Sequence, residues 1–388
     1  MQSAQTLLRF HEAEKVLLVQ DTTSFNFSHH PATEGLGPLG NEHGRGFLAH
    51  STLAVSEVGV PLGLLQQQVW ARSDEEIGKR HQRHQRPFEE KESYKWVKAL
   101  PPAPAPDSSA GYVVVCDAEA HIYEFLDEME TEALDFIVRA AGNRGVTDQG
   151  QPLFEAMTQQ AVQHRFSLLL KRRPDREARE AEVELRFGQL TLQRPQRATT
   201  ERETLTVGVV EVLEPHPPAK EEAVHWVLLT SLPVNSIAQA QQVTLWYTYR
   251  WLVERFHFVL KSGCKLEESQ LRQEARLERL LAVYSVVAWK LLWLTYQTRQ
   301  TPEASCTVAF QPAEWQALYA FIHRTPAIPQ TPPSLRQAVR WLGQLGGFLG
   351  RKGDGDPGVK VLWRGWTRLQ DIVQTYSLFS PLSDVGNA

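Results

Sequence analysis

Cysteine is scarce in this 388-residue chain, which contains only Cys116, Cys264 and Cys306. Three cysteines that lie far apart do not form a disulfide framework or a zinc ribbon, because both need paired thiols at suitable spacings. The scarcity favours a protein of the reducing cytoplasm.

Long hydrophobic runs are also missing. The longest apolar stretch, from Leu280 to Tyr296, is interrupted by Lys290 and is shorter than the roughly 20 residues that a membrane crossing needs. The first residues, MQSAQTLLRFHEAEK, carry acidic side chains where a signal peptide would be basic. We therefore expect a buried helix at 280–296, and neither a membrane protein nor a secreted one.

An excess of positive charge is absent as well, since the formal net charge is -4 and the pI is near 6.4. This balance excludes the uniformly basic surface that is the simplest sign of a nucleic-acid-binding protein. Any anionic partner must therefore bind local basic patches. The hydrophobic content of 42% is ordinary for a globular protein, and a chain of this length is expected to form roughly two or three domains.

Several short apolar runs predict buried strands, and two of them end in aspartate. The run KVLLVQ at 15–20 is followed by Asp21, and YVVVC at 112–116 is followed by Asp117. The runs at 47–56 and 62–70 are separated by turn residues and should form a meander with the first run. Further strands are predicted at 134–140 and 226–230.

The region between those last two strands has a different texture. From about Gly142 to His225, polar and β-favouring residues alternate, which predicts a β-rich insertion with several hairpins. The chain then continues as one helix from Ile237 to about Lys261, and the rest is helical. These changes divide the chain into a first core part (1–141), the insertion (142–225), a second core part with the long helix (226–300) and a helical C-terminal region (301–388).

The predicted helix that begins at Ile237 carries a polar stripe. Residues three or four apart share one face of a helix, so a single stripe holds Tyr247, Arg250, Glu254, His257 and Lys261. The ordinary interpretation is a solvated, charged face opposite the core. The functional interpretation is that Glu254 supplies a third carboxylate beside the two aspartates at the strand ends.

Carboxylates in these three places suit a metal site. Mg²⁺ and Mn²⁺ prefer oxygen ligands, and two such ions about 4 Å apart can stabilise the attacking and leaving oxygens of a phosphoryl transfer. A meander with the first carboxylate, a later strand with the second and a helix with the third is the plan of an α/β, ribonuclease-H-like core. The sequence therefore predicts this core, interrupted by the insertion and followed by the α-helical C-terminal region.

At these residues the sequence resembles the DDE transposases of the insertion-sequence-four family, which are the hairpin-forming, cut-and-paste type. The signature of that family is Tyr, two residues, Arg, three residues, Glu, six residues, Lys, and here it is met by Tyr247, Arg250, Glu254 and Lys261. The resemblance extends over nearly the whole chain, through QDTTSFNFS, RPFEEKESYKW, DAEAHIYEFL, WVLLTSLPV and LGGFLGRKGDGDPGVKVLWRG.

The resemblance implies roles for individual side chains. It implies that Asp21, Asp117 and Glu254 are catalytic and hold two ions of Mg²⁺ or Mn²⁺. It also implies a set of DNA contacts, made by Tyr247, Arg250, His257, Lys261, Arg139 and Trp226. Trp226 resembles the aromatic residue that stacks on a flipped-out base, although a core tryptophan at the start of a strand is an alternative interpretation.

The resemblance also implies a reaction and its partners. Water activated by the metal nicks one DNA strand, the freed 3′ hydroxyl attacks the opposite strand to form a hairpin, water reopens the hairpin, and the 3′ ends then attack target DNA. The partners are double-stranded DNA, at transposon ends and target, and a second copy of the chain that dimerises on DNA through the C-terminal region. The expected location is the bacterial cytoplasm, in association with the nucleoid.

Two features depart from the family. Only 20 residues precede Asp21, where family members carry a helical DNA-binding region. This departure leaves an alternative function open, that of a shortened transposase which dimerises with the full-length enzyme and inhibits it. A structure-selective nuclease of the same fold is a third possibility. The second departure is His121, which stands where the family more often has an acidic residue and which we expect at a surface helix position.

Overall fold

A computed structural model describes the fold of the protein. The described residues are 6–10, 15–40, 44–77, 86–101, 111–143, 145–146, 151–170, 178–219 and 221–379. The chain forms two compact units. The first comprises Met1–Ser28 and Leu36–Glu254, and the second comprises His29–Gly35 and Arg255–Ala388. The boundaries of the four proposed segments stay predictions.

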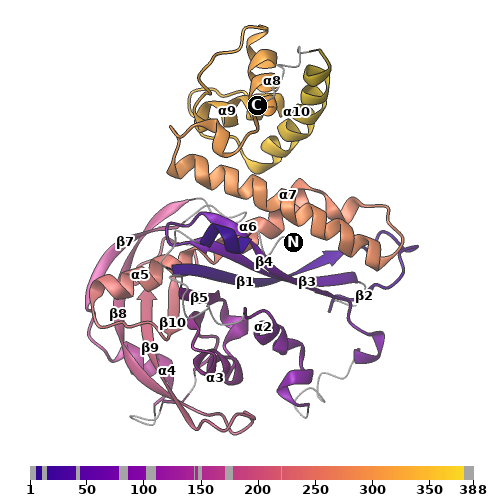
Figure 1. The fold of residues 1–388 in the computed structure, drawn as a ribbon. Helices are drawn as coiled ribbons and strands as arrows, with labels where there is room; N and C mark the ends of the chain where they lie inside the picture. The colour runs from indigo at the N-terminus through magenta and orange to yellow at the C-terminus, as the bar shows by residue number, and fades with distance from the viewer. Residues whose placement is uncertain are drawn as a thin grey trace, which may run out of the picture. The chain divides into compact units, whose positions relative to one another are not determined.

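A mixed sheet of ten strands is the framework of the first unit among the described residues (Figure 1). The strand order is β2-β3-β1-β5-β6-β10-β9-β8-β7, and β4 pairs with β3. β1, β3 and β4 form the predicted antiparallel meander, whereas β5 and β6 lie parallel to β1. The mixed sheet is consistent with the expected ribonuclease-H-like α/β class. Its strands are β1 (Lys15–Asn26), β2 (Gly37–Pro38), β3 (Arg45–Ser56), β4 (Pro61–Trp70), β5 (Gly111–Cys116), β6 (Asp135–Arg139), β7 (His164–Leu170), β8 (Arg179–Gln193), β9 (Thr204–Leu213) and β10 (His225–Thr230).

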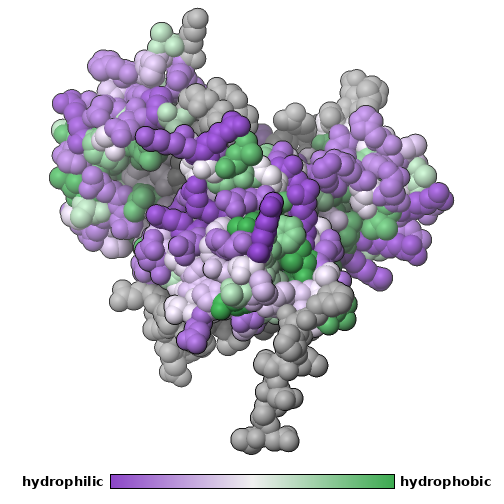
Figure 2. Space-filling model, turned by 90° about the horizontal axis from the view of Figure 1, so that it is seen from above, coloured by the Kyte–Doolittle hydropathy of each residue, from purple (hydrophilic) through white to green (hydrophobic). Residues whose placement is uncertain are grey.

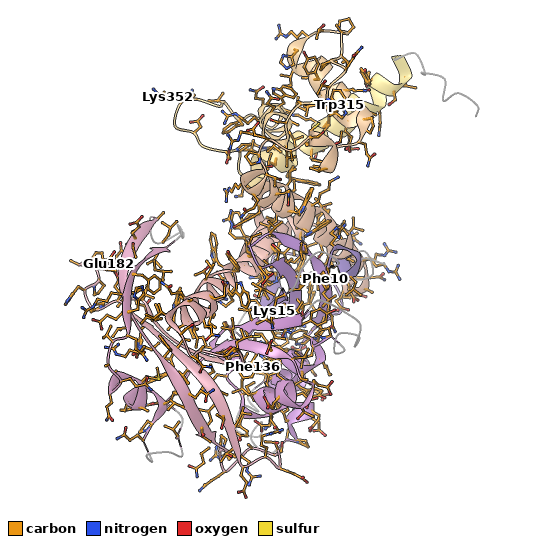
Figure 3. All side chains as sticks on the ribbon, turned by 60° about the vertical axis from the view of Figure 1, so that its left-hand side comes forward. Phe10, Lys15, Phe136, Glu182, Trp315 and Lys352 are labelled. Atoms are coloured by element: carbon orange, nitrogen blue, oxygen red, sulfur yellow. The ribbon has the colours of Figure 1, made fainter. Side chains whose placement is uncertain are left out.

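The strands of the insertion region extend this same sheet. β7, β8 and β9 are antiparallel neighbours, and β9 pairs with β10, which returns to the core beside β6. The alternating burial along β8 explains the alternating polar and β-favouring sequence, because one face of the strand is covered and the other is solvated. Glu182, labelled in Figure 3, lies on this strand.

Two faces of the core sheet are distinguished by the alternation of side chains along its strands. Val16, Leu18 and Val114 belong to the buried cluster that includes residues of α2 (Lys95–Lys98) and α3 (Tyr123–Thr131). Figure 1 shows α2 and α3 on the same side of the sheet. Because successive side chains of a strand point to opposite faces, the odd-numbered residues of β1 and β5 point to the other face.

The long helix predicted from Ile237 to Lys261 is not continuous. It is divided into α5 (Ile237–Thr248), α6 (Trp251–Phe258) and a π-helical turn, Val259–Gly263. At the break, the amides of Tyr249 and Arg250 donate to carbonyls three residues earlier, at 3.0 Å each, so the backbone tightens into a 3₁₀ turn.

Tertiary packing accompanies this break, which contains neither glycine nor proline. The ring of Tyr249 packs on Gly59, in the turn between β3 and β4, so closely that a Cβ on Gly59 would lie 2.7 Å from a ring carbon. Periodicity in the sequence cannot report such a contact. The remaining short elements of this unit are η1 (Leu8–Phe10), η2 (Asp74–Glu76), η4 (Phe88–Glu90), η5 (Glu92–Tyr94), η6 (Ala118–Ala120) and α4 (Leu153–Thr158).

The second unit is helical. α10 packs against α8 and α9, and the carbonyls of one helix approach glycines of the next: a Cβ on Gly365 would lie 1.9 Å from the Leu342 carbonyl oxygen. Trp315 of α8, labelled in Figure 3, is buried. The elements are η8 (Leu266–Glu268), α7 (Glu274–Gln300), η9 (Cys306–Val308), α8 (Pro312–His323), α9 (Leu335–Leu345) and α10 (Val359–Phe379).

The apolar run at 280–296 lies in α7. The Nζ atom of Lys290 lies 4.1 Å from the centroid of the Trp366 ring, and burial lowers the pKa of this lysine. Within the described ranges, no helix has the length and apolar character that a membrane crossing requires. Figure 2 shows hydrophilic residues over most of one face of the molecule, with hydrophobic ones in scattered patches.

Candidate active site

Strand register brings Asp21 and Asp117 to neighbouring positions. In the parallel ladder of β1 and β5, Val19 is opposite Val115. Two residues further along each strand, where side chains return to the same face, the register places Asp21 beside Asp117, whose backbone is still extended. Neighbouring strands lie about 4.8 Å apart, so the two carboxylates share one site.

The same register adds Arg139 and Trp226 to this row. Cys116 is opposite Val138 in the ladder of β5 and β6, so the next pair is Asp117 and Arg139. Arg139 is in turn opposite Leu228 on β10, and Trp226 lies two residues before Leu228, on the same face. One edge of the sheet therefore carries two carboxylates, a guanidinium and an indole.

The electrostatics of Asp117 reflect its burial and the nearby charge of Asp21. Burial raises the pKa of Asp117, and the charge of Asp21 raises it further. A hydrogen bond from the Glu119 amide, 2.9 Å from Oδ1, and the charge of Arg250 lower this pKa only in part. Two adjacent carboxylates that are partly desolvated form a site that favours a cation.

Arg250 and Glu254 bring opposite charges to this site from the helical side. The Arg250 guanidinium donates to the Glu254 carboxylate, and its side chain is only 13% exposed. Burial lowers the pKa of Arg250, but Tyr247, Glu254 and Asp21 more than offset this effect and raise it. Tyr247 is buried too, so the interpretation of the stripe as a solvated face is wrong.

Tyr247 links the stripe to the sheet edge. Its ring meets the ring of Trp226 edge to face, with centroids 5.1 Å apart and planes at 68°. Burial raises the pKa of Tyr247, while the charges of Arg250 and Arg139 lower it in part. Trp226 itself is half-buried. This degree of burial leaves both interpretations of Trp226 open, as a stacking platform and as a core residue.

The other two residues of the stripe lie in the second unit. His257 is buried at the end of α6, and Lys261 lies in the π-helical turn. Their approach to the carboxylates stays a prediction. His121 is a correction, because it is buried and not a surface residue: its Nδ1 atom accepts a hydrogen bond from the Ala141 amide at 3.0 Å, which joins the turn after Asp117 to the end of β6.

Several polar residues around Asp21 were not singled out from the sequence. Gln20 and His50 are fully buried in strands, and His50 contacts Gln20 and Thr22, the two neighbours of Asp21. The signal that could have found them is a glutamine and a histidine inside otherwise apolar strands, since buried polar groups need partners. Cys116 also lies beside the site, but burial first, and then the charges of Asp117 and Asp21, raise its thiol pKa well above the ordinary value.

The donor set fits a divalent cation in part. Asp21 and Asp117 offer oxygen ligands of the kind that Mg²⁺ and Mn²⁺ prefer. Glu254 is engaged by Arg250, and within the described residues no three His, Cys, Asp or Glu side chains are grouped closely enough to hold a metal ion. Two carboxylates, Asp21 and Asp117, thus lie together, and Glu254 is held in an ion pair with Arg250.

Comparison with protein families agrees with this geometry. Residues 94–289, just over half of the chain, match the family described as transposase DDE domain, and residues 286–384 match the Tn5 transposase dimerisation domain. Asp117 and Glu254 lie inside the first match, and Asp21 precedes it. Enzymes of this kind generally use divalent metal ions. The chain therefore belongs to the DDE transposases.

Proposed function

We propose that this transposase cuts and rejoins DNA at the sheet edge formed by Asp21 and Asp117, with Glu254 as the third carboxylate. The observation that carries the proposal is the register, which sets Asp21 beside Asp117 while the charge of the buried Arg250 acts on both Asp117 and Glu254. Catalytic carboxylates on adjacent strands and a facing helix suit phosphoryl transfer, because the reaction needs charge stabilisation at both oxygens of the displacement.

Each side chain has a role in this proposal. Asp21 and Asp117 would hold Mg²⁺ or Mn²⁺, and Glu254 would be the third ligand once its carboxylate no longer binds Arg250. The guanidinium of Arg250 then binds a DNA phosphate, as does that of Arg139, since planar guanidinium groups suit phosphate oxygens. Bound ions supply an activated water and stabilise the charge that develops on the phosphate. His257 and Lys261 are proposed to bind phosphates near the cut.

The proposed reaction is that of the insertion-sequence-four family, to which the Tyr-Arg-Glu-Lys signature points. One strand is nicked at the transposon end, its 3′ hydroxyl attacks the opposite strand, the hairpin is reopened by water, and the 3′ ends join target DNA. The chain acts as a homodimer on double-stranded DNA. Trp226 holds a flipped-out base while the hairpin forms, with the ring of Tyr247 supporting the indole from its edge.

A substitution at Trp226 tests the hairpin step. Trp226→Ala should leave the first nick and reduce hairpin formation, because base stacking on an aromatic face contributes about 1–3 kcal/mol. Trp226→Phe retains a stacking ring and should restore most of the hairpin product. The substrate is an end-labelled DNA duplex that bears the end sequence of the parent transposon. Nicked and hairpin products separate on a denaturing gel. Equal loss of both products in Trp226→Ala would instead assign Trp226 to the core.

The same duplex distinguishes an enzyme from the inhibitor alternative. An enzyme cleaves the duplex in the presence of Mg²⁺ or Mn²⁺. An inhibitor does not cleave, and it suppresses cleavage by a full-length transposase in the same reaction. The proposal of an active enzyme would be wrong if only the second behaviour were observed.

A further inference from the structure

Asp21 lies where β1 has lost one of its two neighbouring strands. The ladder between β1 and β5 ends at Val19 and Val115, whereas the ladder between β1 and β3 continues to Asn26. Asp21 therefore lies within the ladder with β3 and past the end of the ladder with β5. A ligand residue in such a place needs additional contacts if its side chain is to keep one direction.

A buried network supplies such contacts to both neighbours of Asp21. The Nδ1 atom of His50 lies 2.9 Å from Oγ1 of Thr22, and its Nε2 atom lies 3.2 Å from Oε1 of Gln20. The other end of the Gln20 amide, Nε2, donates to the Ala99 carbonyl at 3.4 Å. His50 is 1% exposed, and the ring of Trp96 meets it edge to face at 4.6 Å.

The orientation of the Gln20 amide fixes the roles of the imidazole nitrogens. Because the amide nitrogen of Gln20 faces the carbonyl of Ala99, its oxygen faces His50 and accepts a hydrogen bond. His50 therefore carries a hydrogen on Nε2, and in the neutral tautomer with that hydrogen its Nδ1 accepts the hydrogen of the Thr22 hydroxyl. In this arrangement one imidazole ring makes a hydrogen bond to each of the two neighbours of Asp21.

We propose that His50 is a positioning residue for the Asp21 carboxylate. Gln20 and Thr22 point to the face that carries α2, and Asp21 points to the opposite face. By holding the side chains on either side of Asp21, His50 fixes the direction in which Asp21 presents its carboxylate to a divalent cation. The inference rests on the proposed metal site, and it extends that site to the opposite face of the sheet, on which α2 lies.

Two identical substitutions on adjacent strands separate positioning from stability. Thr22→Val removes the hydroxyl that His50 binds. Thr52→Val is the matched control. The Thr52 side chain lies on the same face of the sheet as that of Thr22, is buried and donates one hydrogen bond, to the Ala99 carbonyl at 3.4 Å, but Thr52 does not flank Asp21. Mn²⁺ binding to each full-length chain is measured by electron paramagnetic resonance of free Mn²⁺, and thermal unfolding is measured alongside. Asp21→Asn defines the loss of the site.

Mn²⁺ should bind Thr22→Val about 10-fold more weakly, the scale on which residues behind a metal ligand act. Thr52→Val should bind Mn²⁺ as the wild type does, even though it is at least as destabilised. His50→Phe, which keeps a ring beside Trp96, should resemble Thr22→Val. Unchanged Mn²⁺ binding by Thr22→Val, or equal weakening by Thr52→Val, would overturn the role of His50. Failure of the wild type itself to bind Mn²⁺ would contradict the proposed metal site and this inference together.

Discussion

At the scale of one residue, Asp117 shows how folding disfavours the charged form of a carboxylate that we propose as a metal ligand. Burial, and after it the charge of Asp21, raises the pKa of Asp117. A carboxyl whose pKa is raised by folding binds its proton more tightly in the folded state. It therefore stabilises the fold at low pH, and that stabilisation is lost as the pH rises through the folded pKa.

Asp117→Asn should consequently be more stable than the wild type at pH 7 when divalent cations are removed, because the neutral amide has no charge to desolvate. The advantage should shrink as the pH is lowered toward the ordinary aspartate pKa of 3.8. Urea unfolding across a pH series measures it. Asp135→Asn is a control that should show no gain, since Asp135 is paired with Lys15 at 2.6 Å. A less stable Asp117→Asn chain at neutral pH would contradict this account of the site.

At the scale of elements, the helix break between α5 and α6 sets the phase between Tyr247, Arg250 and Glu254. Gly59→Ala should destabilise the chain by roughly 2–5 kcal/mol. The substitution places a side chain at a φ of +82°, which costs about 1–2 kcal/mol. It also brings a Cβ to 2.7 Å from the Tyr249 ring, which costs about 1–3 kcal/mol. Gly347→Ala is the control, because Gly347 has a φ of +94° but no atom within 4 Å. Equal losses in chemical denaturation would show that the Tyr249 contact contributes nothing.

Elements also show what the sequence could and could not predict. Apolar runs that end in aspartate located Asp21 and Asp117, because buried strands and their polar ends have a clear local pattern. The spacing of the signature located Arg250 and Glu254 on one face. The break at Tyr249 was missed, since it depends on a contact with a turn 190 residues earlier in the chain.

Register was equally beyond local reasoning. Strand pairing alone shows that Asp117, which follows β5, lies beside Asp21. It also shows that His50 of β3 lies opposite Thr22. The same limit applies to the insertion, whose strands could be predicted but whose continuation of the core sheet through β9 and β10 could not.

At the scale of the whole molecule, residues 286–384 match a dimerisation domain. We therefore ask whether cleavage requires two active copies of the chain. Suppose that both copies must be active to cut both transposon ends. An equal mixture of wild type and Glu254→Gln, at the same total protein concentration, should then give about a quarter of the wild-type paired-end cleavage, because closed dimers form from random pairs. Independent monomers would leave about a half. Gel analysis of a substrate with two labelled ends measures the fraction.

The most direct test of the account is metal-dependent cleavage of a labelled duplex that bears the parent element's end, compared between the wild type, Asp21→Asn and Glu254→Gln. We expect cleavage to require Mg²⁺ or Mn²⁺ and to fall by about 100-fold or more in both variants. Removal of one preorganised group that stabilises charge in a transition state has an effect on this scale. Cleavage that proceeds unchanged in either variant would contradict the assignment of these carboxylates as the catalytic centre.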